Sequence, residues 1–87
     1  MLNTMKSTIE KDIRILKGGW TIASLDDDSK HVKRLSVELA IEGNAKKGYH
    51  LIMTPDGQSA ADFHFDTTED AKEGAEEYFE VSNIQWS

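Results

Sequence analysis

The sequence contains no cysteine, which excludes disulfide bridges, thiolate zinc sites and a cysteine nucleophile. It also has no apolar run near the roughly 18–20 residues that a membrane-spanning helix needs. Its first six residues show neither the apolar segment nor the cleavage site of a secretory signal. Lack of cysteine fits a reducing compartment, so we expect a cytoplasmic protein without a membrane anchor.

Basic residues are scarce as well, because 16 acidic residues outnumber 10 basic ones and leave a net charge of −6. Phosphate backbones repel this balance, so direct binding to nucleic acid is not expected. An acidic surface suits a basic protein partner through electrostatic steering. The alternative is that the acidity serves solubility alone.

The chain has 87 residues, which predicts a single domain over residues 1–87. A domain of this size buries only roughly 60–65% of its unfolded surface. Large internal active-site cavities are therefore not expected, although an apolar content of 38% is enough for a core.

Residues 7–17 have the marks of a helix. Ser7 and Glu10 have the spacing of a capping box, in which each side chain bonds the backbone amide of the other. Gly18-Gly19 is a typical helix stop. One helical stripe is formed by Ile9, Ile13 and Leu16. The alternative is a hairpin that turns on the two glycines, since Ile13 and Ile15 also alternate.

Two strand patterns follow the glycine pair. Residues 20–25 are rich in strand-forming side chains. Residues 33–41 alternate strictly between apolar and other side chains, which is typical of a half-buried strand. The apolar face of that second strand carries Leu35, Val37, Leu39 and Ile41.

A hairpin is predicted after residues 49–54, with Pro55-Asp56-Gly57 as its loop. Such a loop places Thr54 opposite Gln58 and fixes the rest of the register. The expected pairs are then Tyr49 with Phe63, His50 with Asp62, and Leu51 with Ala61. One face is apolar, with Tyr49, Leu51, Met53, Ala61, Phe63 and Phe65, and the other carries His50, Asp62 and His64.

An acidic amphipathic helix is predicted over residues 67–80, capped by Asp66 or by Thr67. Its buried stripe is Ala71, Ala75, Tyr78 and Phe79. Outside the stripe lie Glu69, Asp70, Glu73, Glu76, Glu77 and Glu80, with Lys72 as the only base. In the tail that follows, Trp86 is expected to fold back onto the domain.

The predicted fold class is α+β, with the element order α-β-β-β-β-α. Four strands joined by short loops favour an antiparallel meander. Because each strand has one apolar face, both helices are expected to cover that face in a two-layer arrangement.

The chain shows no catalytic or cofactor signature, so a non-enzymatic protein is expected. His50, His64 and Asp62 share a strand face, but a zinc site needs a further ligand and the simpler reading is an exposed His–Asp pair. Asp26-Asp27-Asp28 lacks the spacing of a calcium loop. No catalytic, cofactor-binding or metal-ligating residue is therefore assigned.

The stretch from Gly48 to Glu77 resembles the strand–turn–strand–helix unit of HicB-type antitoxins. The marks are Phe65-Asp66-Thr67-Thr68-Glu69-Asp70-Ala71 and Ala75-Glu76-Glu77. The chain departs from that pattern by a preceding helix and by the lack of a DNA-binding tail. In size and acidity it is similar to the small immunity proteins that neutralise bacterial toxins.

Two functional hypotheses follow. The first is an acidic inhibitor or immunity-type protein that binds a basic partner, such as a nuclease toxin, through Glu69, Asp70, Glu73, Glu76, Glu77 and Glu80. The second is a structural or oligomerising domain that forms a homodimer through its open sheet face, where His50, Asp62 and His64 lie.

Overall fold

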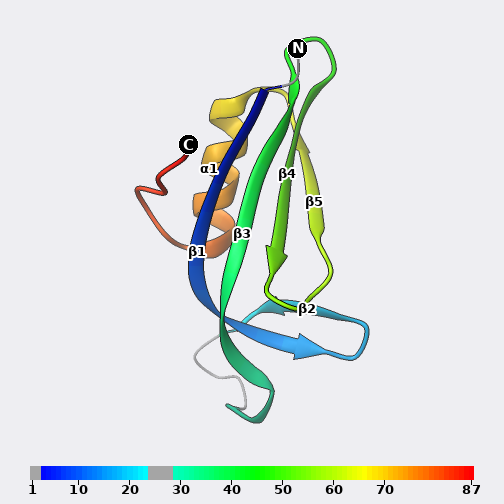
Figure 1. Ribbon diagram of the computed structural model, residues 1–87, viewed down its shortest axis with the longest axis vertical. Helices are drawn as coiled ribbons and strands as arrows, with labels where there is room; N and C mark the ends of the chain where they lie inside the picture. Colours follow the sequence, from blue (N-terminus) through cyan, green and yellow to red (C-terminus); the bar gives the residue numbers. More distant parts are fainter. Residues whose placement is uncertain (1–2, 24–28) are drawn as a thin grey trace.

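The computed structural model describes residues 3–23 and 29–87, which form one curled antiparallel sheet with a helix packed against it (Figure 1). The five strands lie in the order β2-β1-β3-β4-β5. A short 3-10 turn, Ser29–His31, precedes β3. The elements are β1 (Asn3–Leu16), β2 (Gly19–Ile22), β3 (Val32–Asn44), β4 (Gly48–Pro55), β5 (Ala61–Phe65) and α1 (Thr68–Phe79). No helix among these residues is long and apolar enough to cross a membrane.

The predicted two-helix, four-stranded fold is wrong, because the expected first helix is the long strand β1. Residues 3–14 of β1 pair with β3 in an unbroken antiparallel ladder. Both Ile13 and Ile15 turn towards the core in this strand, whereas a helix would point them to different sides. Ser7 lies opposite Leu39 and caps no helix.

This region forms a hairpin, as in the alternative prediction, but the turn lies one residue earlier than the expected Gly18-Gly19. Leu16 pairs with Gly19 across a two-residue turn, Lys17-Gly18, and β2 runs back along β1. The expected strand over residues 20–25 is found as Gly19–Ile22. Residues 24–28, which include the three consecutive aspartates, lie outside the described residues.

The sheet is curled, as the bend of β1 towards β2 shows in Figure 1. This bend brings the β1–β2 hairpin close to the loop between β4 and β5. The indole Nε1–H of Trp20 in β2 donates a hydrogen bond of 2.8 Å to the carbonyl of Ser59 in that loop. The Trp20 ring also lies nearly perpendicular to the ring of Tyr78 in α1, with centroids 6.5 Å apart. Contacts between distant segments therefore hold the curl.

The register of the β4–β5 hairpin differs from the prediction by two residues. His50 lies opposite His64, Leu51 opposite Phe63 and Tyr49 opposite Phe65. The reason is that Pro55 remains in β4, where it pairs with Val37, so the loop extends over residues 56–60. A shift of two leaves every side chain on its predicted face.

The core lies between the sheet and α1, on what we call the inner face of the sheet. Its buried residues are Ile13, Val37, Leu39, Ile41, Tyr49, Leu51, Met53, Ala71, Ala75 and Phe79. The stripe predicted for the helix is thus confirmed for three residues, while Tyr78 is half-buried. Gly74 allows α1 to lie close to β5, because the ring of Phe65 occupies the space that a Cβ would need.

The C-terminal tail folds back onto the domain, as expected for Trp86. Trp86 packs against the core. The next residue, Ser87, exchanges two backbone hydrogen bonds of 3.0 Å with Lys6 of β1. The tail therefore covers part of the β1 edge that β2 leaves unpaired.

The predicted cap of α1 by Thr67 is confirmed, since its hydroxyl accepts a 3.0 Å hydrogen bond from the Asp70 amide. We expect Thr67→Ala to lower the free energy of unfolding by about 1 kcal/mol, because that amide loses its acceptor. Thr68→Ala is the matched control, since Thr68 bonds only the neighbouring Glu69 side chain. Urea unfolding measures both variants, and an equal loss in the two would contradict a capping role.

Candidate partner-binding surfaces

The acidic residues of α1 do not all line the same surface. Asp70, Glu73 and Glu77 face the side of β5. Glu76 is half-buried next to the C-terminal tail, where its carboxylate accepts a hydrogen bond of 3.4 Å from the Ile84 amide. Glu76 therefore holds the tail and is not free to bind a partner.

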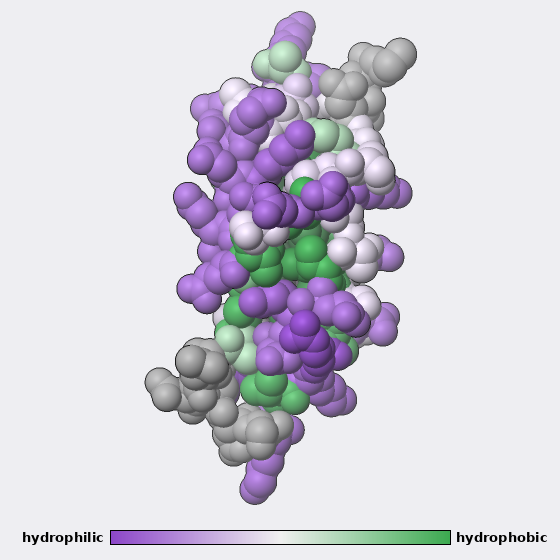
Figure 2. All heavy atoms as spheres, turned by 90° about the vertical axis from the view of Figure 1, so that its left-hand side faces the viewer, coloured by the Kyte–Doolittle hydropathy of each residue, from purple (hydrophilic) through white to green (hydrophobic). Residues whose placement is uncertain are grey.

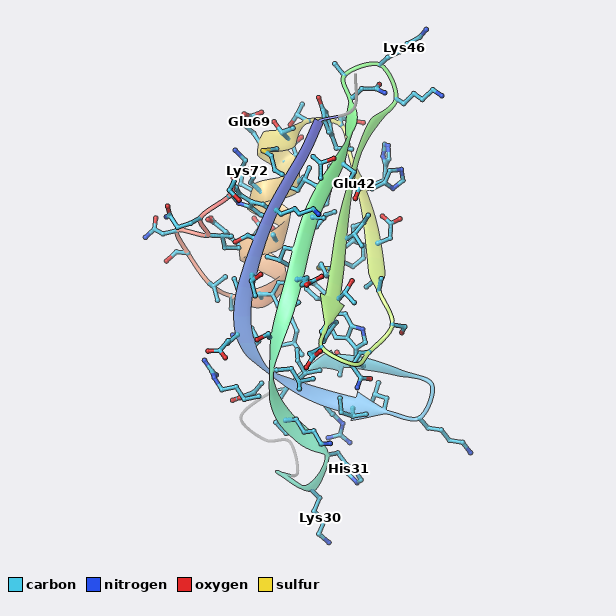
Figure 3. All side chains as sticks on the ribbon, in the orientation of Figure 1. Lys30, His31, Glu42, Lys46, Glu69 and Lys72 are labelled. Carbon is cyan, nitrogen blue, oxygen red and sulfur yellow. The ribbon has the colours of Figure 1, made fainter. Side chains whose placement is uncertain are left out.

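The remaining acids of the predicted set lie near the helix ends. Glu69 is in the first turn and accepts a hydrogen bond of 3.1 Å from the Thr68 hydroxyl. Glu80 is the C-cap residue, in the left-handed conformation. Figure 3 shows Glu69 and Lys72 together on α1, so the only base of the helix lies beside its first turn. The six predicted acids thus do not form one surface.

A hollow of about 360 Å³ lies where α1 meets the end of β5. We call it the acidic groove. From the helix it is lined by Asp70, Glu73, Gly74 and Glu77, and from β5 and its end by His64, Phe65 and Asp66. Four carboxylates and no lysine or arginine line it, so its electrostatic potential is negative at neutral pH.

His50, Asp62 and His64 lie on the outer face of the sheet, opposite to α1. His50 Nδ1 lies 3.0 Å from Asp62 Oδ1, and His64 Nε2 lies 3.1 Å from the Lys47 carbonyl oxygen. A carbonyl only accepts, so His64 Nε2 carries the hydrogen of that bond. The two rings meet edge to face, with centroids 5.1 Å apart.

Within residues 3–23 and 29–87, no three histidine, aspartate or glutamate side chains are grouped closely enough to hold a metal ion. The nitrogen of His50 nearest to Asp62 and the Nε2 of His64 are both in hydrogen bonds. The simpler prediction for this face, an exposed His50–Asp62 pair, agrees with the observed contact.

His64 belongs to both surfaces, because it projects from the outer face and also lines the acidic groove. The two candidate surfaces of the sequence therefore meet at β5, the last strand of the sheet. The sequence patterns did not indicate this edge as a binding surface. The signal for it was the succession of β3, β4 and β5, which pair in chain order, so that the last of them lies at an edge of the sheet.

A second hollow, of about 500 Å³, lies between β1 and the C-terminal tail. Its apolar lining includes Ile9, Val81 and Ile84. Figure 2 shows this side of the molecule, with apolar side chains in a strip between hydrophilic ones. Sequence reasoning missed it, because the predicted helix over residues 7–17 left no free strand edge there.

Comparisons with protein-family models, with curated proteins and with solved structures find no match to this chain.

Proposed function

We propose that this chain is a non-enzymatic binding protein that docks a basic protein partner at the acidic groove, as an inhibitor or immunity-type protein. A nuclease toxin is an example of such a partner, because an enzyme that grips a phosphate backbone presents a basic surface. The observation that carries the proposal is the gathering of Asp66, Asp70, Glu73 and Glu77 around one hollow without a lysine or arginine among its lining residues.

Physical chemistry supports this reading in two ways. Carboxylates held close together repel one another, and a cationic side chain placed among them relieves that repulsion. The negative field also steers a basic protein towards the groove and raises the association rate. Both effects weaken as salt is added.

Reversing the charge of the groove tests the proposal. We expect the double variant Glu73→Lys, Glu77→Lys to bind its partner at least about tenfold more weakly, because two attractions become two repulsions. The partner is recovered by affinity purification from the source cells, and its affinity is then measured by titration calorimetry at low and high salt. If the partner is a nuclease, adding one equivalent of the unmodified chain should block its activity.

The matched control is Glu69→Lys with Glu80→Lys, which changes the net charge by the same amount at the two ends of α1, outside the groove lining. This control should retain most of the affinity at moderate salt. Equal losses in the two double variants would show that net charge acts without a defined site. Undiminished binding by the Glu73→Lys, Glu77→Lys variant would rule out the acidic groove.

A further inference from the structure

Within the described part of the chain, no strand pairs with the outer edge of β5. β5 ends the strand order of the sheet, and its only strand partner among the described residues is β4. In an antiparallel pair, alternate residues of an edge strand direct their amide and carbonyl groups away from the neighbouring strand. Such an edge is a template for one more strand.

The edge of β5 carries one charged side chain, Asp62, but lacks other features that normally prevent pairing. Its sequence from Ala61 to Phe65 contains no lysine and no proline, and its pairing with β4 shows no bulge. The side chain of Phe63 is 42% exposed beside this edge. The edge of β1 differs, since the protein's own Ser87 pairs with Lys6 there.

The surroundings of β5 indicate what kind of strand fits. On the inner side, Phe63 packs edge to face against Tyr78 and offers an apolar contact, and the acidic groove lies next along the strand, beside Phe65. On the outer side lies the carboxylate of Asp62. Two copies of this chain joined edge to edge would bring these carboxylates together, so charge favours a basic strand over a second copy.

We propose that the partner adds a basic β-strand to the outer edge of β5. The backbone of this strand continues the sheet, which gives affinity, and its alternate side chains give specificity. An apolar side chain lies against Phe63, and a lysine or arginine further along the same face enters the acidic groove between Glu73 and Glu77. This inference rests on the proposed function and specifies how that docking occurs.

The probe is a synthetic seven-residue peptide with blocked ends that has lysine at positions 2 and 5, valine at positions 4 and 6 and threonine elsewhere, so that one lysine shares a strand face with both valines. Two further peptides have the same sequence but carry N-methyl groups on either the odd or the even backbone amides. A β-strand pairs through the amides of one edge only, so one methylated peptide loses these hydrogen bonds and the other keeps them. A peptide with glutamate in place of lysine is the charge control.

Binding and backbone amide exchange of the whole chain are followed by NMR. We expect the parent peptide to bind and to slow exchange in residues 61–65. One methylated peptide should bind at least about tenfold more weakly than the parent, and the other about as well, because only one set of amides makes the inter-strand bonds. The glutamate peptide should not bind.

The outcomes separate strand addition from docking by charge. If both methylated peptides bind like the parent while Glu73→Lys, Glu77→Lys abolishes binding, strand addition is overturned and the proposed function stands. If one methylated peptide alone loses binding but the double variant binds normally, strand addition stands, whereas the proposed function and the entry of a lysine into the acidic groove are overturned. Protection of β1 in place of β5, or no binding of the lysine peptide, overturns the inference.

Discussion

Phe79→Ala is expected to remove most of the stability of this domain. Phe79 is the largest fully buried side chain and has no exposed surface. Its ring lies at the end of α1, among core residues of the sheet. Truncation of a buried phenylalanine costs about 3–5 kcal/mol, because the apolar contacts are lost and a cavity remains. A domain of this size has roughly 5–15 kcal/mol in total.

The measurement is urea unfolding followed by circular dichroism. Phe63→Ala is the matched control, since it makes the same chemical change at a side chain that is 42% exposed. This control should lose only about 1 kcal/mol of the free energy of unfolding, because Phe63 buries much less apolar surface than Phe79 does. Similar losses in the two variants would contradict the position of Phe79 at the centre of the core.

Gly43→Ala is expected to be similarly destabilising, by more than about 3 kcal/mol. Gly43 lies near the end of β3 with a φ of 148°, a backbone conformation that residues other than glycine rarely adopt. A Cβ there would clash with the backbone carbonyl oxygen of Gly48 and lie 2.8 Å from Tyr49 Cα. Backbone atoms cannot rotate away, so the β3–β4 hairpin would have to separate.

Gly57→Ala separates the two causes of this effect. Gly57 also has a positive φ, of 76°, but no atom lies within 4 Å of the place where its Cβ would be. Only the backbone cost of about 1–2 kcal/mol is then expected. Thermal unfolding of both variants is the measurement. A loss for Gly57→Ala as large as that for Gly43→Ala would show that conformation alone, without the clash, explains the result.

The sequence predicted α1 and three strands well because their signals are local. The cap at Thr67 and the spacing of Ala71, Ala75 and Phe79 lie within one short segment. The alternation of residues 33–41 matches the buried face of β3, although the strand itself extends over Val32–Asn44. The inner and outer faces of β4 and β5 also follow from alternation, which survives the two-residue error in register.

The first helix was wrongly predicted because residues 7–17 satisfy two periods at once. Ile9, Ile13 and Leu16 fit a helical stripe, while Ile9, Ile13 and Ile15 fit one face of a strand. The choice depends on the long ladder with β3, whose residues are distant in sequence. Pairing with that strand gives the backbone groups along one edge of β1 their partners and turns both Ile13 and Ile15 towards the core.

For the candidate site, the sequence by itself determined which residues carry the charge: the acids of α1 and the exposed His50–Asp62 pair. The tertiary structure alone decided their grouping. It turned Glu76 to the tail, gathered Asp66, Asp70, Glu73 and Glu77 beside Phe65, and left β5 as an open edge. The physical reason is that composition and periodicity act within a segment, whereas register, curl and strand order depend on contacts between segments far apart in the chain.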